Sequence, residues 1–322
     1  MDDRGAMRRA MALASSVRGT TSPNPWVGCT LSTGHEGATQ PPGGPHAEAV
    51  ALAAAGDAAR GATLWTTLEP CAHTGRTGPC TEAIVAAGIA RVVVGIEDPD
   101  PLVAGRGIER LRAAGVEVEV GVLAEEVAAQ LAPYVKHRTT GRPYVVLKLA
   151  ASLDGRTAAP DGSSKWITGE AARADAHRLR AESDAVLVGA GTVRADDPEL
   201  TVRHVEGRDP LRVVLGKAPA GAKVHPALEL SGEPETVLDK LGADGILQVL
   251  VEGGATVAHR FHAARLVDRY VVYVAPALFG GDDARGLFAG PGAATVDDVW
   301  RGRIVSVERL GDDLRIELEG SA

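Results

Sequence analysis

The sequence has 322 residues, of which 45% are hydrophobic and 24% charged, and its formal net charge is -8 at pH 7. A chain of this length exceeds one ordinary hydrophobic core, so we expect two domains. The acidic balance argues against a nucleic-acid-binding surface, and no apolar run approaches the roughly 20 residues of a membrane span. Three cysteines are too few for a disulfide framework, so a reducing, cytoplasmic location is the expectation.

The first half of the chain alternates predicted helices and strands, which indicates an α/β layered domain. A helix over residues 1–18 lacks the apolar core of a signal peptide. In the loop that follows, Pro23 and Pro25 hold Asn24 in extended backbone. Residues 31–44 are rich in turn formers, so little regular structure is expected there. The other expected elements are helix 46–59, strand 62–67, helix 80–87, strand 91–96, helix 104–114, strand 116–120 and helix 122–137.

The second half begins after a polar linker at residues 137–143, which predicts domains 1–142 and 143–322. It is again α/β but ends in several strands, so we expect a mixed sheet. Residues 217–245 are expected to lack a strand and a helix. The expected elements are strand 144–150, helix 169–181, strands 185–189, 211–215 and 246–251, helix 255–264, and strands 268–275, 303–309 and 313–319.

The strongest chemical signal lies between His46 and Cys80. A histidine, a glutamate two residues later, a Pro-Cys pair and a second cysteine match the arrangement of zinc-dependent nucleobase deaminases. Zinc prefers imidazole and thiolate ligands, and a catalytic zinc uses three protein ligands with a fourth position for water. We therefore predict a zinc site of His46, Cys71 and Cys80, with Glu48 moving the protons.

Two strand-to-glycine turns in the second half indicate a dinucleotide site. They are Gly189-Ala190-Gly191-Thr192 and Glu252-Gly253-Gly254-Ala255-Thr256. Backbone amides at such turns can bind phosphate, and two turns in one sheet suit a pyrophosphate. Neither is the Gly-x-Gly-x-x-Gly fingerprint, so a simple turn is the alternative for each. Lys148, Arg180 and Arg203 are cations that could bind a substrate phosphate.

Over essentially its whole length, the sequence resembles the bifunctional deaminase–reductases of riboflavin biosynthesis. The matching stretches of the first half are Pro-Asn-Pro-x-Val-Gly at 23–28, Pro-His-Ala-Glu at 45–48 and the segment 69–80. Those of the second half are Leu-Lys-x-Ala-x-Ser-Leu-Asp-Gly at 147–155, Ser-Lys-Trp-Ile-Thr at 164–168, Gly-Ala-Gly-Thr-Val at 189–193, Asp-Asp-Pro at 196–198 and Val-Glu-Gly-Gly-Ala at 251–255. Their number, order and spacing make the resemblance specific.

The resemblance implies a cytidine-deaminase-like α/β/α layer followed by a dihydrofolate-reductase-like mixed-sheet domain, with Zn²⁺ and NADPH as cofactors. The first implied reaction is zinc-hydroxide deamination of 2,5-diamino-6-ribosylamino-4(3H)-pyrimidinone 5′-phosphate. The second is NADPH reduction of the ribosyl group to ribityl. Phosphorylated pyrimidines are the implied substrates, and a homodimer through the second domain is the implied assembly.

The resemblance also implies which residues contact each ligand. Zinc would be bound by His46, Cys71 and Cys80, with Glu48 catalytic. The deaminase substrate would contact Asn24, His73, Arg76 and Thr77. The reductase substrate would contact Lys148, Ser164, Arg180, Leu200, Arg203 and Glu252. NADPH would contact Ala150, Trp166, Thr192, Asp196, Gly254, Ala255 and Thr256.

Three other interpretations stay open. The expected shortening of residues 217–245 would suit a deaminase whose degenerate second domain serves only dimerisation. A structural zinc protein would have four protein ligands, for which His73 could supply the fourth. An enzyme that edits bases in nucleic acid is disfavoured by the acidic charge and by the reductase-like half.

Overall fold

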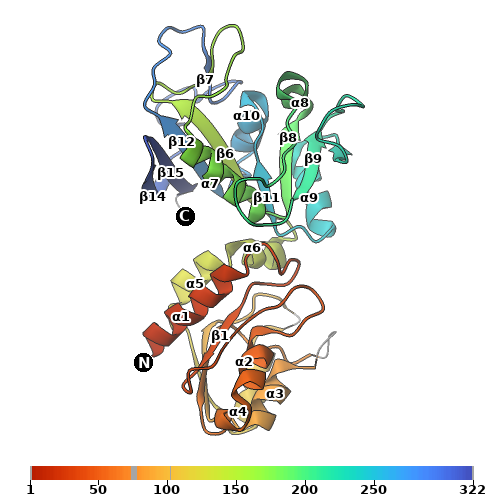
Figure 1. Ribbon diagram of the computed structural model, residues 1–322, viewed down its shortest axis with the longest axis vertical. Helices are drawn as coiled ribbons and strands as arrows, with labels where there is room; N and C mark the ends of the chain where they lie inside the picture. Colours follow the sequence, from red (N-terminus) through yellow and green to blue (C-terminus); the bar gives the residue numbers. More distant parts are fainter. Residues whose placement is uncertain (1, 74–77, 102, 321–322) are drawn as a thin grey trace. The chain divides into compact units, whose positions relative to one another are not determined.

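The computed structural model describes residues 2–73, 78–101 and 103–320. The chain divides into two compact units, Met1–Gly141 and Arg142–Ala322 (Figure 1). Each unit has its own main sheet with helices packed on it, and the second unit also has a two-stranded sheet of β7 (Arg156–Ala158) and β13 (Arg285–Gly286). Within the described ranges, no helix combines the length and the apolar character that crossing a membrane requires.

The first unit is built on a five-stranded sheet of order β2-β1-β3-β4-β5. Strands β3, β4 and β5 are parallel, whereas β1 is antiparallel to both of its neighbours. Helices α1 and α5 lie on one face, and α2, α3 and α4 lie on the other (Figure 1). The strands are β1 (Gly28–Leu31), β2 (Glu36–Ala38), β3 (Thr63–Leu68), β4 (Arg91–Ile96) and β5 (Glu117–Val120). The helices are α1 (Asp3–Ser16), α2 (Ala47–Ala55), a 3₁₀ turn η1 (Gly56–Ala59), α3 (Cys80–Ala87), α4 (Arg106–Ala113), α5 (Ala124–Gln130) and α6 (Ala132–Thr140).

One expectation for the first unit was wrong, and another missed a short strand. Residues 31–44 contain the second strand of a β1–β2 hairpin, in which Cys29 pairs with Gly37. Turn-forming residues do not prevent this, because Gly34 adopts the left-handed backbone that a tight hairpin needs. The single helix expected over 122–137 is two helices, α5 and α6. They are divided at Leu131, and Pro133 occupies the first turn of α6, where its missing N–H is tolerated.

The second unit is built on an eight-stranded mixed sheet of order β10-β9-β8-β11-β6-β12-β15-β14. The first six strands are parallel, and β15 and β14 add antiparallel strands at one edge. The strands are β6 (Tyr144–Ser152), β7 (Arg156–Ala158), β8 (Ala185–Gly189), β9 (Leu211–Leu215), β10 (Leu228–Leu230), β11 (Gln248–Val251), β12 (Arg269–Ala275), β13 (Arg285–Gly286), β14 (Gly302–Leu310) and β15 (Asp313–Gly320). The helices are α7 (Glu170–Ala181), α8 (Ala190–Asp196), α9 (Pro234–Ala243) and α10 (Ala255–Ala263). Its core joins β6, β8 and β11 to the apolar faces of α9 and α10.

The expectation that residues 217–245 lack a strand and a helix was wrong. Strand β10 pairs in parallel with β9, and helix α9 follows it. Helix α9 begins at Pro234, a residue suited to the first helical position, and it buries Val237, Leu238 and Leu241 in the core. Helix α8 was also not predicted. Residues 217–245 therefore contribute both a strand and a helix to this side of the sheet.

A buried carboxylate connects three segments of the first unit. Glu69 follows β3 and is 3% exposed. Its Oε2 accepts hydrogen bonds from the backbone N–H groups of Asp98 (3.1 Å) and Gly105 (3.0 Å). Its Oε1 accepts from Gly107 (2.7 Å) and Ile108 (3.2 Å). The negative charge also faces the N-terminus of α4, where it is favoured. Glu69 thus fixes the ends of β3 and β4 against α4.

Replacing Glu69 by Ala should destabilise the protein strongly, because four backbone N–H groups, three of them in buried hydrogen bonds, lose their acceptor. We expect the free energy of unfolding to fall by about 3–5 kcal/mol, measured by urea denaturation of the zinc-loaded protein. The matched control is Glu125→Ala, which removes an exposed glutamate on α5 and should change stability by less than about 0.5 kcal/mol. Equal unfolding midpoints for the two variants would contradict this role.

Candidate functional site

The structure brings the three predicted zinc ligands together. His46 precedes α2, Cys71 lies just beyond β3, and Cys80 is the first residue of α3. His46 Nδ1 lies 3.6 Å from the Sγ of Cys71 and 3.4 Å from the Sγ of Cys80. Ordinary zinc–ligand bond lengths at tetrahedral angles place nitrogen and sulfur about 3.5 Å apart. These two distances match a bound zinc, and all three ligand atoms lie within 4.8 Å of one another.

The ligand set has the composition of a catalytic zinc site. Among the residues described, the cluster contains one histidine and two cysteines, and no further histidine, cysteine or carboxylate joins it. His73 is not a member, so the four-ligand structural alternative has no support. A three-ligand set is what zinc enzymes use, whereas structural zinc sites have four protein ligands.

The local charges suit a metal. The adjacent Cys80 thiol and the His46 ring lower the pKa of Cys71 to about 4. The hydrogen bond with Cys71 in turn raises the pKa of Cys80. The backbone N–H of Cys80 also points at Cys71 Sγ, at 3.4 Å. Glu48, on α2, is 3% exposed, and burial raises its pKa to about 7. Zinc binds cysteine as thiolate, so metal binding would release thiol protons.

A pocket of about 390 Å³ opens beside these ligands. This volume suits one small molecule. Of the residues predicted for the deaminase substrate, Asn24 and His73 line the pocket. Arg76 and Thr77 lie outside the described residues. Other lining residues that the sequence did not single out are Thr39, Asp98, Asp100, Tyr134 and Arg138.

Asp98 is the most tightly held of these additional residues. It follows β4 and accepts hydrogen bonds on its two carboxylate oxygens from the hydroxyl of Tyr134, at 3.1 and 3.2 Å. Burial raises the pKa of Asp98 above its ordinary value. The signal for it was present in the sequence, because an acidic, proline-rich turn after a buried parallel strand lies at the edge where ligands bind.

The second unit has a larger cleft, of about 1450 Å³, at the carboxyl ends of β6, β8, β9 and β11. The volume exceeds that of a typical one-ligand pocket, so a dinucleotide and a second substrate can share it. The cleft is lined by every residue predicted for this unit's ligands: Lys148, Ala150, Ser164, Trp166, Arg180, Thr192, Asp196, Leu200, Arg203, Glu252, Gly254, Ala255 and Thr256.

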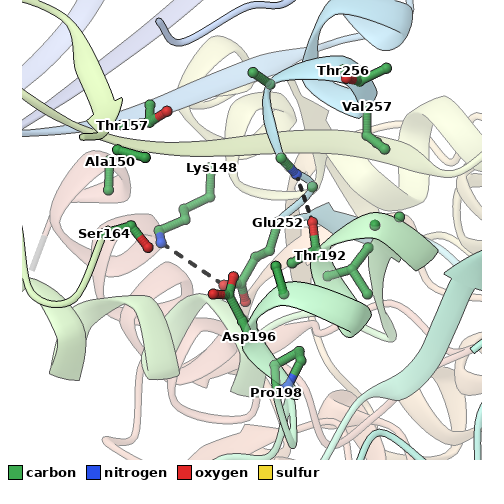
Figure 2. Close-up of a pocket in the computed structure, with 18 of the residues that line it drawn as sticks. Lys148, Ala150, Thr157, Ser164, Thr192, Asp196, Pro198, Glu252, Thr256 and Val257 are labelled. Carbon is green, nitrogen blue, oxygen red and sulfur yellow. Dashed lines mark hydrogen bonds and ion pairs between the residues drawn. The ribbon is translucent and has the colours of Figure 1, made fainter. Parts of the chain in front are cut away.

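A charged cluster lies at the bottom of this cleft. Arg180 donates two hydrogen bonds to Glu252, at 2.5 and 2.9 Å. Figure 2 shows Lys148 pointing toward the same carboxylate, and its Nζ lies 3.9 Å from Glu252 Oε2. Burial opposes the charge of Glu252, but Arg180 outweighs it and lowers the pKa of this carboxyl. Burial also lowers the pKa of Lys148. Lys148 is therefore a cation that gives up its proton more easily than a free lysine.

The glycine turn before α10 is shaped for close approach. A Cβ on Gly253 would lie 2.5 Å from the Cβ of Val257, so only glycine fits there. The backbone N–H of Gly254 donates to Thr192 Oγ1 at 3.1 Å, which joins the two glycine turns across the cleft (Figure 2). Backbone N–H groups at the start of a helix such as α10 can bind a phosphate. The residues therefore fit a dinucleotide cofactor.

Comparison with known proteins matches both units. Residues 1–96 match the cytidine and deoxycytidylate deaminase zinc-binding region, and residues 143–316 match the RibD C-terminal domain. The chain is 41% identical to riboflavin biosynthesis protein RibD of Escherichia coli, over 100% of both chains. It is 44% identical to the protein of that name from Mycobacterium tuberculosis, over 97% of this chain and 96% of the other.

Solved structures give the same result. RibD of Acinetobacter baumannii superimposes with a TM-score of 0.93 at 40% identity, over 99% of both chains. A diaminohydroxyphosphoribosylaminopyrimidine deaminase/5-amino-6-(5-phosphoribosylamino)uracil reductase from Thermotoga maritima gives a TM-score of 0.90 at 35% identity, again over 99% of both. These matches confirm the fold class and the resemblance that the motifs indicated. The chain belongs to the RibD family of riboflavin biosynthesis proteins.

Proposed function

We propose that each unit of the chain carries one reaction of a bifunctional enzyme of riboflavin biosynthesis. The chain is a zinc-dependent deaminase and an NADPH-dependent reductase that acts on phosphorylated pyrimidines. The unit Met1–Gly141 is assigned the deamination and the unit Arg142–Ala322 the reduction. The observation that carries the proposal is that each unit has a pocket lined by residues that suit its chemistry.

The alternative of a deaminase with a degenerate second domain is not favoured. It depended on a missing strand and helix between residues 217 and 245, and both elements are present as β10 and α9. The residues assigned to a cofactor and a second substrate in this unit also line its cleft. A second domain that served only dimerisation would have no reason to keep the Lys148–Glu252–Arg180 cluster buried and charged.

In the deaminase, Glu48 moves the protons. When bound, zinc supplies a Lewis acid that lowers the pKa of water. Glu48 takes a proton from the attacking water and passes one to the leaving amine, so the ring carbon exchanges an amino group for a carbonyl oxygen and ammonia is released. Asn24, held between two prolines, and His73 orient the pyrimidine from the pocket wall. Because Glu48 is buried, bulk water does not compete for these protons.

Glu48→Gln should abolish deamination while zinc stays bound. The amide fills the same space but cannot transfer protons, so we expect ammonia release to fall by about 10²–10⁴-fold. Ammonia release and zinc content are measured on the same preparation. Glu125→Gln, on the exposed face of α5, is the matched control and should behave as wild type. Deamination near the wild-type rate in zinc-loaded Glu48→Gln would refute the assigned role.

In the reductase, the cluster at the bottom of the cleft provides the proton. Opening of the ribosyl ring gives a C1′–nitrogen double bond, whose reduction needs a hydride at C1′ and a proton at the nitrogen. NADPH, held by the residues that line the cleft, would supply the hydride. Lys148 is suited to supply that proton because its ammonium faces the cleft and burial lowers its pKa. Glu252, held by Arg180, keeps Lys148 in place and charged. Ser164, Leu200 and Arg203 are assigned to the sugar phosphate.

Lys148→Met should lower NADPH-dependent reduction by about 10²–10⁴-fold and leave deamination unchanged. Reduction is followed as loss of NADPH absorbance with the deaminated intermediate as substrate. Lys240→Met, on the exposed side of α9, is the control for loss of one lysine. Since the proton donor must be charged, the wild-type rate should also decline as pH rises through the pKa of Lys148, which lies below the 10.5 of a free lysine. A rate that Lys148→Met leaves intact would contradict the assignment.

We further propose that the second unit forms a homodimer through β14, in a reducing cytoplasmic setting that suits the thiolate ligands. β14 is the edge strand of its sheet and exposes three aliphatic side chains: Ile304 (58% exposed), Val305 (40%) and Val307 (58%). A long apolar edge strand is a ready template for pairing with another chain. The same strand of a second copy would pair with the backbone N–H and C=O groups of β14 and would cover its apolar side chains.

Ile304→Asp combined with Val307→Asp should convert a dimer to a monomer, because the charges would have to be buried in the interface. Mass is measured by light scattering after size-exclusion chromatography. Val120→Asp, on the edge strand β5 of the other sheet, is the control and should leave the mass unchanged. A wild-type protein that elutes as a monomer at all concentrations would rule out this interface.

A further inference from the structure

Most of the cations that line the reductase cleft are already held by a partner. The held side chains and their partners are Lys148 and Arg180 with Glu252, Lys165 with the carbonyl of Asp196, Arg173 with the carbonyl of Thr168, Arg203 with Glu199, Lys223 with Asp197 and Arg260 with Glu233. Within the part of the chain that the structure describes, Arg194, Lys217 and Arg285 line the cleft with side chains that make no hydrogen bond or ion pair. They are thus available to a ligand.

Two of these cations, Lys217 and Arg285, lie at opposite ends of the cleft. The strands whose carboxyl ends form it follow the order β9-β8-β11-β6. Lys217 comes two residues after β9, at one end. Arg285 lies on β13, which pairs with β7, the strand that follows β6 at the other end. A ligand that spans the cleft therefore meets one of these cations at each extremity.

Arg194 belongs to the same end as Lys217. The turn after β9 packs on the start of α8, since a Cβ on Gly216 would lie 3.1 Å from the Cβ of Ala190. Arg194 lies four residues after Ala190, one turn along the same face of α8. Further along, the backbone N–H of Lys223 donates to Asp197 Oδ1 at 2.9 Å, so the segment after β9 follows α8 along its length.

The cations at the β9 end of the cleft favour binding of a phosphate group there. A dinucleotide with its pyrophosphate at the glycine turns after β8 and β11 extends toward β6 on one side and β9 on the other. In dinucleotide sites, a carboxylate at the end of a neighbouring strand binds the ribose 2′-hydroxyl of NAD, whereas a cation accommodates the 2′-phosphate of NADP. Residues 215–223 contain two lysines and no carboxylate.

We propose that Lys217, with Arg194, binds the 2′-phosphate of NADPH and so sets the preference for NADPH over NADH. The inference rests on the proposed reductase function, because it assigns the adenosine end of the cofactor to the β9 end of the cleft. Ala150, on β6, and Thr256, at the start of α10, would then contact the nicotinamide half and the pyrophosphate. Lys217 and Arg194 are specificity-determining residues and take no part in hydride transfer.

The test is direct binding, by titration calorimetry on the full zinc-loaded chain. The probes are 2′,5′-ADP, which carries the 2′-phosphate, and 5′-AMP, which lacks it. Loss of a charge-assisted contact should weaken 2′,5′-ADP binding to Lys217→Ala by about tenfold or more, while 5′-AMP binding stays unchanged. Lys217→Arg should restore most of the affinity. NADPH and NADH titrations should show the same difference.

Two control variants separate local recognition from general electrostatics. Lys240→Ala removes a lysine outside the cleft, and Arg285→Ala removes a cation at its other end; both should bind 2′,5′-ADP as wild type does. The inference is overturned if Lys217→Ala loses 2′,5′-ADP and 5′-AMP equally, or if it binds both as wild type does. A wild-type chain that binds neither NADPH nor 2′,5′-ADP would overturn the reductase function itself, so the two failures are distinguishable.

Discussion

A buried carboxylate follows a central strand in each of the two sheets, and each site depends on how that charge is satisfied. In the first unit, Glu69 accepts four backbone hydrogen bonds from residues 98–108. Cys71 lies two residues further on, so this zinc ligand is attached to a point held by four hydrogen bonds. Gly107 completes the arrangement, because a Cβ there would lie 1.9 Å from the carbonyl oxygen of Pro70.

In the second unit, Glu252 follows β11 and is satisfied by side chains instead of the backbone. Arg180 takes both of its oxygens, and Lys148 approaches from β6. The difference explains the two roles. A carboxylate that accepts only from the backbone has a fixed environment and serves as an anchor. A carboxylate paired with a lysine that can lose its proton keeps a charged, exchangeable group at the edge of a cleft. The same position in two sheets therefore supports structure in one and chemistry in the other.

The sequence was sufficient where function depends on short motifs at element ends. The three zinc ligands come together as the motifs indicated, Glu48 lines the pocket beside them, and the residues predicted for the second unit line its cleft. The sequence did not predict the elements whose formation depends on tertiary packing. The β1–β2 hairpin forms because Gly37 lets α2 pack closely, with a Cβ there only 2.2 Å from the carbonyl oxygen of Ala47. β10 and α9 form because Val237, Leu238 and Leu241 complete the core of the second unit. Asp98 and Tyr134 are distant in sequence, and their hydrogen bond could not be read from either segment alone.

The central claim is that one chain performs a zinc-dependent deamination and an NADPH-dependent reduction in sequence. The most direct measurement supplies the purified, zinc-loaded protein with the diamino-pyrimidinone ribosyl phosphate, follows ammonia release, then adds NADPH and follows its absorbance. The account predicts ammonia first and NADPH oxidation second, with Glu48→Gln blocking the first signal and Lys148→Met only the second. Ammonia release without any NADPH oxidation in the wild-type protein would contradict the account, because the second unit would then have a cleft without an activity.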